Sequence, residues 1–409
     1  MHYELKLYLA ALFIHSTLAL PSLGSSTDSI RSKLRSILPS LNPSFLLLSK
    51  PSLESRSYPP SALDVNPNGT TFLWLPEDEY SGSTFFDNFS FYTGEDPTQS
   101  FDSGTVNFLN ATAAFSDGLA YVQDNGIVIM KGDNTSTLAN GVNRNSVRIS
   151  SNKQYNTGLF ILDINQAPWG CGVWPAFWTV GGGTWPLTGE IDIIEGVHDN
   201  EHNQVTWHTG PNCTLTPEGN FTGTIVQTNG VNNTNCDGND NDNAGCGITE
   251  WSRASYGPFF DQQGGGVFAM KWDENGIAVW SFYRAAIPQD IQAGSPNPSG
   301  WGDPVAALEP GGCDPLTNFV NHSIIFDITF CGDWAGNSYA TSGCPGTCSE
   351  QLMEPSNFDN ATWSINSIKV YRKQLLSGQI TGGAVIARSN LNWDIASILF
   401  VFTLIFLAI

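Results

Sequence analysis

The chain has 409 residues, of which 41% are hydrophobic and 12% aromatic, with 13 Trp and 24 Phe. This composition can build a large core and excludes a chain that is disordered throughout. The formal net charge of −21 repels phosphate backbones and anionic membrane surfaces. It therefore argues against nucleic acid as a partner and leaves a neutral polymer open.

The first part of the chain has the pattern of a targeting segment. A hydrophobic run follows Lys6 and extends to Leu20, and small residues occupy 22–25. This pattern predicts a signal peptide over residues 1–24, with a short membrane anchor as the alternative. Residues 25–68 are rich in Ser, Pro and Leu and almost lack aromatic residues, so we interpret them as a spacer or propeptide.

From residue 69 to 374 the chain consists of short β-prone segments separated by Gly, Asn and Asp. Asp273-Glu-Asn-Gly276 joins two such segments and predicts a hairpin with an Asn-Gly turn. No long amphipathic helix and no repeat is recognisable. The pattern predicts one all-β domain, an antiparallel sandwich or jelly roll. The segments expected as strands include 126–130, 146–150, 158–164, 267–272, 277–283, 323–330 and 363–371.

Residues 189–196, which read GEIDIIEG, carry the candidate chemistry. In a strand, Glu190 and Asp192 share one face, and strict alternation would put Glu195 on the other face. A β-bulge, which inserts one extra residue, would return Glu195 to the acidic face. Three carboxylates on one face repel one another, and such crowding raises the pKa of at least one of them. Retaining glycoside hydrolysis needs this split, with an ionised nucleophile and a protonated acid about 5–5.5 Å apart.

The flanking residues favour a sugar site over a solvated strand face. Four tryptophans precede Glu190 within 21 residues, and aromatic rings stack on the apolar faces of sugars. Core packing is the alternative for each of them, and for Trp174 and Phe177 in particular. His208 lies in another apolar strand, where a structural histidine is the common alternative. The four tryptophans are Trp169, Trp174, Trp178 and Trp185.

The insert between Cys236 and Cys246 contains several acids. A Ca²⁺ loop of the EF-hand type needs Gly at its sixth position and Glu at its twelfth, but Asp242 and Ile248 stand there. We therefore expect a solvated loop. Nothing in the sequence locates a metal or a cofactor.

The C-terminal residues 375–409 are predicted to be a spacer followed by a hydrophobic signal for a glycosylphosphatidylinositol anchor. Small residues at 382–384 and a spacer of ten residues precede the apolar stretch Ile395 to Ile409. A transmembrane helix is the alternative, but fifteen residues are fewer than the roughly twenty that span a bilayer.

Eight cysteines are compatible with four disulfides in an oxidising compartment, although their pairing cannot be deduced. Zinc is the alternative for Cys344 and Cys348, without a neighbouring His. Nine N-x-Ser/Thr sequons predict a secreted glycoprotein. They begin at Asn68, Asn88, Asn110, Asn134, Asn212, Asn220, Asn232, Asn321 and Asn360.

Residues 189–196 and Trp174-Pro-Ala-Phe-Trp178 resemble glycoside hydrolase family 16, in its bulged ExDxxE branch of laminarinase-like endo-β-1,3(4)-glucanases, with fungal members the most similar. The resemblance covers about 300 residues. It continues through the segments 78–86, 92–98, 146–150, 207–210, 331–334 and 365–371.

This resemblance implies a concanavalin A-like antiparallel β-jelly-roll sandwich with a substrate cleft across its concave sheet. Glu190 would be the nucleophile, Glu195 the general acid/base and Asp192 the assisting acid. The glucose subsites would be lined by Trp178, Trp185 and Trp334, and His208 and Arg148 would form hydrogen bonds near the cleavage point. A β-glucan polysaccharide would be the partner, and we expect a monomer. We expect no cofactor and assign no residue to a metal, although some members of the family hold a structural Ca²⁺ elsewhere.

Three functions remain open at this point. The first is endo-hydrolysis of β-1,3- or mixed β-1,3/1,4-glucan. A cell-wall transglycosylase at the same site is the second, because a sugar hydroxyl can replace water in the second step. Wall crosslinkers of the family resemble the unbulged ExDxE pattern, which argues against it. A non-catalytic glucan-binding lectin is the third, although a binder has no use for crowded acids.

Overall fold

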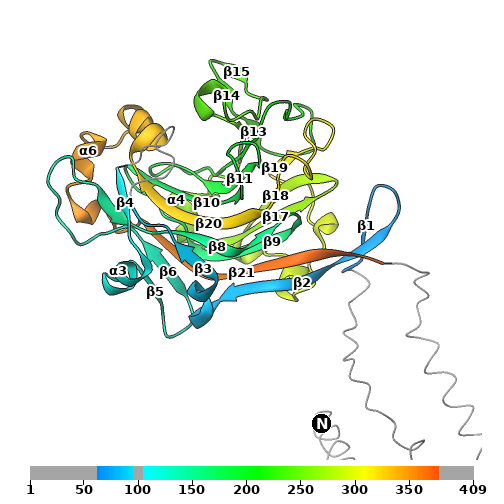
Figure 1. Ribbon diagram of the computed structural model, residues 1–409, viewed down its shortest axis with the longest axis horizontal. Helices are drawn as coiled ribbons and strands as arrows, with labels where there is room; N and C mark the ends of the chain where they lie inside the picture. Colours follow the sequence, from blue (N-terminus) through cyan, green and yellow to red (C-terminus); the bar gives the residue numbers. More distant parts are fainter. Residues whose placement is uncertain (1–61, 95–104, 377–409) are drawn as a thin grey trace, which may run out of the picture. The chain divides into compact units, whose positions relative to one another are not determined.

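The computed structural model of the protein describes residues 62–94 and 105–376. Strands dominate this part of the chain, and each segment expected to be a strand overlaps one, so the all-β prediction is confirmed. The segment 146–150 differs in one respect, because it is divided between two strands at the buried residue Val147. Figure 1 shows long, curved strands stacked over one another.

Two antiparallel sheets form the domain. The larger one has nine strands in the order β1-β2-β21-β9-β17-β18-β19, with β6 pairing β21 and β5 pairing β6. Their bounds are β1 Asp64–Val65, β2 Thr71–Ser81, β5 Ala120–Val122, β6 Val128–Lys131, β9 Gly158–Gln166, β17 Gly266–Asp273, β18 Gly276–Tyr283, β19 Ala306–Leu308 and β21 Thr362–Leu375.

The second sheet carries the candidate chemistry. Its eight strands have the order β13-β16-β12-β11-β10-β20-β8-β3, so the acidic strand β11 lies inside the sheet between β10 and β12. Their bounds are β3 Phe89–Phe91, β8 Arg148–Tyr155, β10 Val173–Gly181, β11 Glu190–Glu195, β12 Gln204–His208, β13 Thr224–Ile225, β16 Cys246–Thr249 and β20 His322–Phe330.

The remaining elements are short. β4 Val106–Phe108 pairs in parallel with β7 Arg144–Ser146, and β14 Gln227–Thr228 pairs with β15 Val231–Asn232. The α-helices are α3 Ala111–Ser116, α4 Gly257–Gln262, α5 Gln289–Gln292 and α6 Cys348–Gln351. Single turns of other helix types are η3 Gly82–Thr84, η4 Phe86–Asn88, η5 Asn241–Asn243, η6 Arg284–Ala286, η7 Pro298–Gly300, η8 Gly332–Gly336, η9 Tyr339–Thr341 and η10 Pro355–Phe358.

The main core contains apolar side chains from both sheets. Ile191, Ile193 and Ile194 of β11 are fully buried in it, together with Phe160 and Phe268 from the nine-stranded sheet. Burying each such side chain stabilises the fold by about 1.5–3 kcal/mol. Because β11 uses its isoleucines for this core, its acids are left for the other face of the sheet.

The predicted hairpin is present, with Asp273 of β17 opposite Gly276 of β18. Gly276 has φ 115°, a conformation that side chains disfavour, so the glycine is needed in this turn.

All eight cysteines form disulfides, as their even number predicted. Cys344 and Cys348 belong to two different bridges, which rules out the zinc alternative. The pairs are Cys171–Cys344, Cys213–Cys313, Cys236–Cys246 and Cys331–Cys348.

The predictions for the chain termini fall largely outside the described residues. The predicted signal peptide (1–24) lies outside the described residues, as does nearly all of the segment 375–409 with its anchor signal. Of the predicted spacer (25–68), only residues 62–68 are described, and they include β1, which pairs with β2. Within 62–94 and 105–376, the search for a helix long and apolar enough to cross a membrane found none.

Candidate active site

The strand β11 contains a β-bulge between its acids. On the side of β12, Asp192 lies opposite Thr206 and Glu195 opposite Gln204, with a change of register between the two pairs. On the side of β10 the register also shifts, between Phe177 and Trp178. The bulge that the sequence pattern required is therefore present.

The extra residue changes which side chains face the core. Ile193 and Ile194, the two residues within the bulge, are both fully buried. Glu195 thereby returns to the face of Glu190, and both glutamates are half-buried and line one cavity. A regular strand would have placed Glu195 among the isoleucines.

The cavity over β11 has a volume of about 290 Å³. Its floor comes from β10, β11 and β12, and its rims come from the insert after Cys236 and from η8. Its lining residues are Trp174, Glu190, Glu195, Gln204, Thr206, His208, Val226, Asp242, Asn243, Ala244, Asp333 and Trp334.

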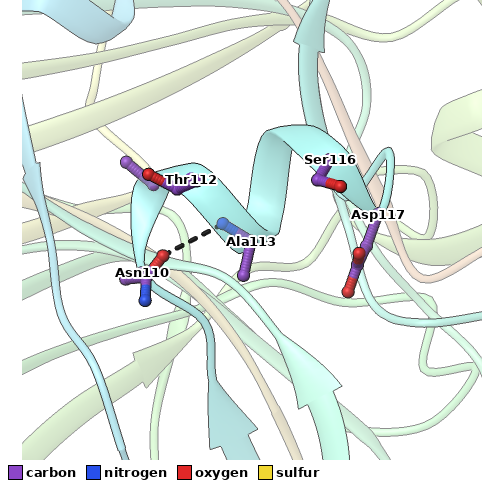
Figure 2. A pocket seen from close by; sticks show the side chains of 6 residues that line it. Asn110, Thr112, Ala113, Ser116 and Asp117 are labelled. Carbon is purple, nitrogen blue, oxygen red and sulfur yellow. Dashed lines mark hydrogen bonds between the residues drawn. The ribbon is translucent and has the colours of Figure 1, made fainter.

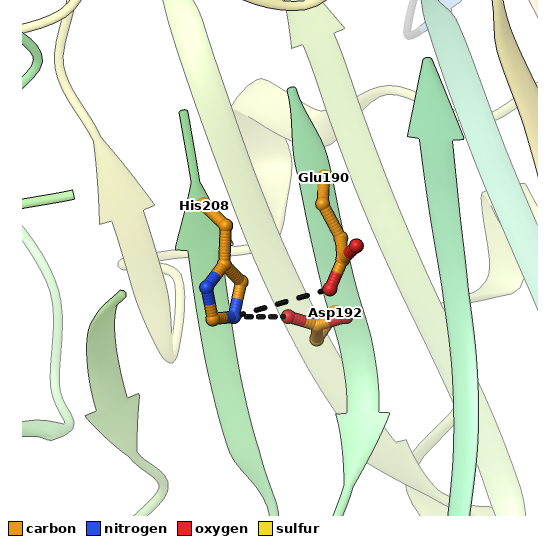
Figure 3. Close-up of side chains that lie close together, drawn as sticks. All are labelled: Glu190, Asp192 and His208. Carbon is orange, nitrogen blue, oxygen red and sulfur yellow. Dashed lines mark ion pairs between the residues drawn. The ribbon is translucent and has the colours of Figure 1, made fainter. Parts of the chain in front are cut away.

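Glu190 lies in a cluster of polar groups (Figure 3). Its Oε2 accepts a hydrogen bond of 2.9 Å from the indole nitrogen of Trp185, and its Oε1 lies 4.0 Å from Nε2 of His208. The same Nε2 is 3.3 Å from Oδ2 of Asp192, which is buried. The imidazole of His208 thus faces both acids at once.

Glu195 has different neighbours. Its Oε1 accepts a hydrogen bond of 2.9 Å from the indole nitrogen of Trp174, whose ring meets that of Trp334 edge to face at 6.0 Å. The backbone N–H of Glu195 donates to the side chain of Asn203 at 2.9 Å. The side chain of each glutamate therefore accepts a hydrogen bond from an indole. Such a bond to an ionised carboxylate is stronger than one between two neutral groups.

The residues predicted to bind substrate occupy different positions. Trp334 and His208 line the cavity, and Trp185 bonds Glu190 beside it. Trp178 and Arg148 do not line it. Trp178 is 8% exposed, donates to Asp327 at 2.9 Å and packs beneath the guanidinium of Arg148, whose carbon lies 5.0 Å from the ring centroid.

Trp169 takes no part in the cavity, because its indole nitrogen donates to Asp261 at 2.6 Å instead. The burial of Asp261 raises the pKa of its carboxyl to about 7. Trp169 thus supports the structure away from the cavity.

The insert between Cys236 and Cys246 is more than a solvated loop. Its residues are mostly exposed, but Asp242, Asn243 and Ala244 form one rim of the cavity. Asn241, Asp242 and Asn243 all have φ near 55–63°, which Asn and Asp tolerate better than other side chains. The disulfide Cys236–Cys246 closes this rim at its base.

Some lining residues were missed by the sequence analysis. Gln204 and Thr206 share the alternation of His208 on β12, so strand parity was the available signal. Trp174 was not missed, because it had been left open between a sugar contact and core packing, and its indole bonds Glu195. Asp333 lies next to the predicted Trp334 and had no signal of its own.

One group of side chains in the described part of the chain could hold a metal ion. It consists of Glu190, Asp192 and His208, whose possible ligand atoms lie within 4.8 Å of one another. Their polar atoms are directed toward each other, and Oε2 of Glu190 accepts the indole N–H of Trp185. This arrangement suits proton chemistry between the three groups.

A second hollow lies at α3 and is lined by 110–113 and 116–117 (Figure 2). Asn110 caps the helix by accepting the backbone N–H of Ala113 at 3.0 Å. Asp117 is the one carboxylate in its lining, so this hollow lacks the pair of acids that the cavity over β11 has.

The chain is similar to known proteins in sequence and in structure. Residues 89–371 match a family model described as the XgeA-like, catalytic GH16 domain. A probable glycosidase of Schizosaccharomyces pombe is 44% identical over 299 residues, which are 72% of this chain and 68% of that protein. A probable endo-1,3(4)-beta-glucanase of Aspergillus niger is 42% identical over 304 residues, 72% of this chain and 39% of the relative.

Two solved structures are similar over the same region. Laminarinase 16A of Phanerochaete chrysosporium, solved with two β-glucan molecules in its donor and acceptor sites, is 40% identical with a TM-score of 0.68. An elongating β-1,3-glucosyltransferase of GH family 16 is 38% identical with a TM-score of 0.66. The alignments cover 73% of this chain and 99% and 100% of those chains.

Proposed function

The chain belongs to glycoside hydrolase family 16, and from this premise we propose that it is a retaining endo-hydrolase of β-1,3- or mixed β-1,3/1,4-glucan. The observation that carries the proposal is the bulge of β11, because it directs the side chains of Glu190 and Glu195 toward the same cavity. Each of these carboxyl groups accepts a hydrogen bond of 2.9 Å from an indole nitrogen. Family membership and the matched relatives support the choice of substrate class.

In the first step, a carboxylate oxygen of Glu190 attacks the anomeric carbon of a bound glucose unit. The bond from this carbon to the glycosidic oxygen breaks, and the carboxyl of Glu195 gives its proton to that oxygen. The product is a glycosyl ester of Glu190 and a shortened glucan with a new hydroxyl group. Trp185 stabilises the leaving carboxylate of Glu190 when the ester later breaks, because its N–H bonds the charged form more strongly.

In the second step, the Glu195 carboxylate takes a proton from water, and the water oxygen attacks the anomeric carbon. The ester bond to Glu190 breaks, and the anomeric configuration is retained after two inversions. Asp192, the assisting acid, lies beside the nucleophile, with its Oδ2 3.3 Å from Nε2 of His208.

The tryptophans at the cavity provide sugar contacts in this proposal. Trp334 and Trp174 offer rings at the rim next to Glu195, and Trp185 offers its ring next to Glu190. Trp178 of β10 and Arg148 of β8 line a subsite farther along the sheet, two and four strands from β12. Sugars stack on such rings while polar groups fix their orientation.

We further propose that the protein is a monomeric, secreted glycoprotein, held at the cell surface or wall by a C-terminal lipid anchor. Four disulfides and nine sequons support an extracellular site of action. Most of the sequon asparagines are exposed, and Asn134 is half-buried, so an attached glycan would have access to solvent. The net charge of −21 has little influence on a neutral glucan.

A second candidate activity is transfer of the glycosyl group to another glucan. The likeness to an elongating β-1,3-glucosyltransferase, at 38% identity, favours this candidate. A sugar hydroxyl then replaces water in the second step, with the same residues in the same roles. A labelled laminari-oligosaccharide acceptor decides between the two, because transfer lengthens the labelled chain, whereas hydrolysis shortens it or leaves its length unchanged.

The experiment for the leading proposal uses laminarin, lichenan and a β-1,4-glucan with the wild-type protein and with Glu190→Gln. We expect the wild type to release reducing sugar from laminarin and Glu190→Gln to lose this activity. Glu218→Gln is the matched control, because Glu218 is exposed and lies outside the cavity. An active Glu190→Gln protein would remove Glu190 from the nucleophile role, and an inactive wild type would end the proposal.

A further inference from the structure

Asn203 lies directly before β12, and its side chain turns toward the backbone of β11 at the bulge. Its amide nitrogen donates to the carbonyl oxygen of Ile193 at 2.9 Å, and its amide oxygen accepts the N–H of Glu195 at 2.9 Å. A carbonyl only accepts and a backbone N–H only donates, so these partners fix the orientation of the amide. Asn203 therefore holds β11 on both sides of Ile194.

The two backbone groups that Asn203 bonds lie where the ladder to β12 is interrupted. The pairing of β11 with β12 passes from Asp192 to Glu195 with a change of register, so Ile193 is displaced from the regular pattern. Asn203 is fully buried, so its amide makes these two bonds inside the protein. Without the amide, the buried carbonyl of Ile193 and the part-buried N–H of Glu195 would each lose this partner, which has an energetic penalty.

Asn203 is itself held in place by its main chain. Its N–H donates to the hydroxyl of Ser255 at 2.9 Å, and its carbonyl accepts the N–H of Glu250 at 2.8 Å. With these two bonds added to those of its amide, the position of Asn203 is set by its neighbours. The hydrogen bonds from the side chain of Asn203 can therefore fix the position of the β11 backbone at the bulge.

We propose that Asn203 is a positioning residue, whose side-chain amide stabilises the bulge of β11 and thereby holds the carboxyl of Glu195 where it protonates the leaving group. The inference rests on the role proposed for Glu195. Without the amide, the bulged form of β11 loses stability relative to a regular strand. In a regular strand Glu195 would face the core, because a shift of the register by one residue exchanges the two faces.

The test compares Asn203→Ala with the wild type on two substrates. Laminarin has a poor leaving group that needs a proton, whereas 2,4-dinitrophenyl β-laminaribioside has a leaving group that departs as a stable anion. We expect kcat on laminarin to fall by about 10²-fold or more with KM changed less than about threefold. The burst of dinitrophenolate, which reports attack by Glu190, should stay within about fivefold of the wild type.

Azide provides a readout that a merely structural role would not change. If Glu195 no longer activates water, azide should accelerate turnover of the aryl substrate and yield a β-glycosyl azide, because azide attacks the anomeric carbon without losing a proton. A laminarin kcat within about threefold of the wild type, or equal losses of both the burst and laminarin turnover, would overturn the proposal.

Ser151 offers a matched control in the same sheet. Its hydroxyl accepts the N–H of Ile324 at 2.8 Å and donates to the carbonyl of Lys153 at 2.7 Å, at the register shift between β8 and β20. Ser151→Ala removes a buried side chain that bridges backbone groups far from the acids in the strand order. We expect this variant to unfold at a lower temperature while keeping the laminarin kcat within about twofold.

Asn203→Asp keeps the test decisive if Asn203→Ala does not fold. The introduced carboxyl group, when protonated, has a donor and an acceptor like the amide, but its ionised form cannot donate to the carbonyl of Ile193. Burial raises the pKa of this new group, because Asn203 is fully buried. The ratio of the variant's laminarin kcat to that of the wild type should rise about tenfold or more as pH falls, and a flat ratio would contradict the proposal.

The two proposals fail in distinguishable ways. An inactive wild type, or an active Glu190→Gln protein, would end the proposed function. A fully active Asn203→Ala protein beside an inactive Glu190→Gln protein would end only the role of Asn203.

Discussion

The two ends of β11 carry the same functional group in two different settings. Glu190 and Glu195 each accept an indole N–H at 2.9 Å, from Trp185 and Trp174. Beyond this shared donor, Glu190 lies among other ionisable side chains, with the imidazole of His208 at 4.0 Å. Glu195 lies at the end of the bulge, where its backbone N–H donates a hydrogen bond to the side-chain amide oxygen of Asn203.

This difference teaches how one strand can give two carboxyl groups opposite roles. Charges near a carboxylate change its affinity for protons and its nucleophilicity. A backbone irregularity changes where a carboxyl lies. We infer that the charges around Glu190 tune its carboxylate and that the bulge sets the position of Glu195, so that substitutions at the two ends should have different kinetic signatures.

The largest expected effect separates the two glutamates. Glu190→Gln should lower kcat by about 10⁴-fold or more on both laminarin and 2,4-dinitrophenyl β-laminaribioside, because no other group forms the glycosyl ester. Glu195→Gln should lower kcat on laminarin by about 10³-fold but keep the burst of dinitrophenolate. Stopped-flow absorbance measures the burst, and a Glu190→Gln protein that retains it would exchange the two assignments.

Asp192→Asn tests the electrostatic end. The substitution keeps the size of the side chain and removes the charge that lies 3.3 Å from His208. We expect kcat on laminarin to fall by about 10²-fold and the pH of maximal kcat/KM to shift, because the nearby acids no longer share a proton. The complete pH profile is the measurement. A profile that keeps its shape would indicate that Asp192 has only a structural role.

The two indole donors give a smaller and more selective effect. A hydrogen bond to a charged group contributes about 1.5 kcal/mol at the lower end of its range, and about 1.36 kcal/mol is a factor of ten in rate. Trp185→Phe and Trp174→Phe should therefore each lower kcat on laminarin by about tenfold or somewhat more. Neither substitution should slow the burst with the aryl donor, because the burst needs no proton from Glu195 and loss of the Trp185 N–H leaves the Glu190 carboxylate a better nucleophile. A slower burst in either variant would show that the indole acts on the sugar and not on the acid.

The smallest expected effect concerns stability and involves a carboxyl outside the cavity. Glu250 is buried, and this burial raises the pKa of its carboxyl from 4.5 to about 7, although Ser281 donates a hydrogen bond to it. Between these pH values the folded state holds a proton that the unfolded state has released. Folding stability therefore falls as pH rises from about 4.5 to 7, by about 1.4 kcal/mol per pH unit.

Glu250→Gln, whose side chain does not titrate, should remove this contribution. Chemical denaturation at a series of pH values from about 4 to 8 measures the difference between the two proteins. Equal slopes for wild type and Glu250→Gln would show that Glu250 ionises normally in the folded protein.

Much of the fold and the centre of the site could be predicted because they depend on local patterns. Alternation along β11 and the surplus residue between Asp192 and Glu195 indicated a bulge, and the structure contains it. The Asn-Gly turn at Gly276 indicated its hairpin in the same way. Such patterns reflect side-chain direction and turn geometry, which neighbouring residues determine.

Other features depend on contacts between distant segments, which a single sequence does not encode locally. Asn203 reaches across to β11, and the insert bends so that Asp242 forms a rim of the cavity. Disulfide pairing over a separation of 173 residues, as in Cys171–Cys344, is of the same kind. Arg148 was expected near the cleavage point, but it stacks on Trp178 outside the cavity lining, because β20 and β10 lie between β8 and β11.

The first and last strands of the nine-stranded sheet determine how the domain can be attached to other structures. β1 and the end of β21 both pair with β2, and the N–H of Leu376 donates to the carbonyl of Thr71 at 2.9 Å. The polypeptide thus enters and leaves the domain at neighbouring points, both on the sheet that does not carry the acids. A domain with adjacent ends can be inserted into a loop of a host protein or immobilised through either end. In both formats the attachment points lie on the nine-stranded sheet, and the cavity on the other sheet remains accessible to a long polymer.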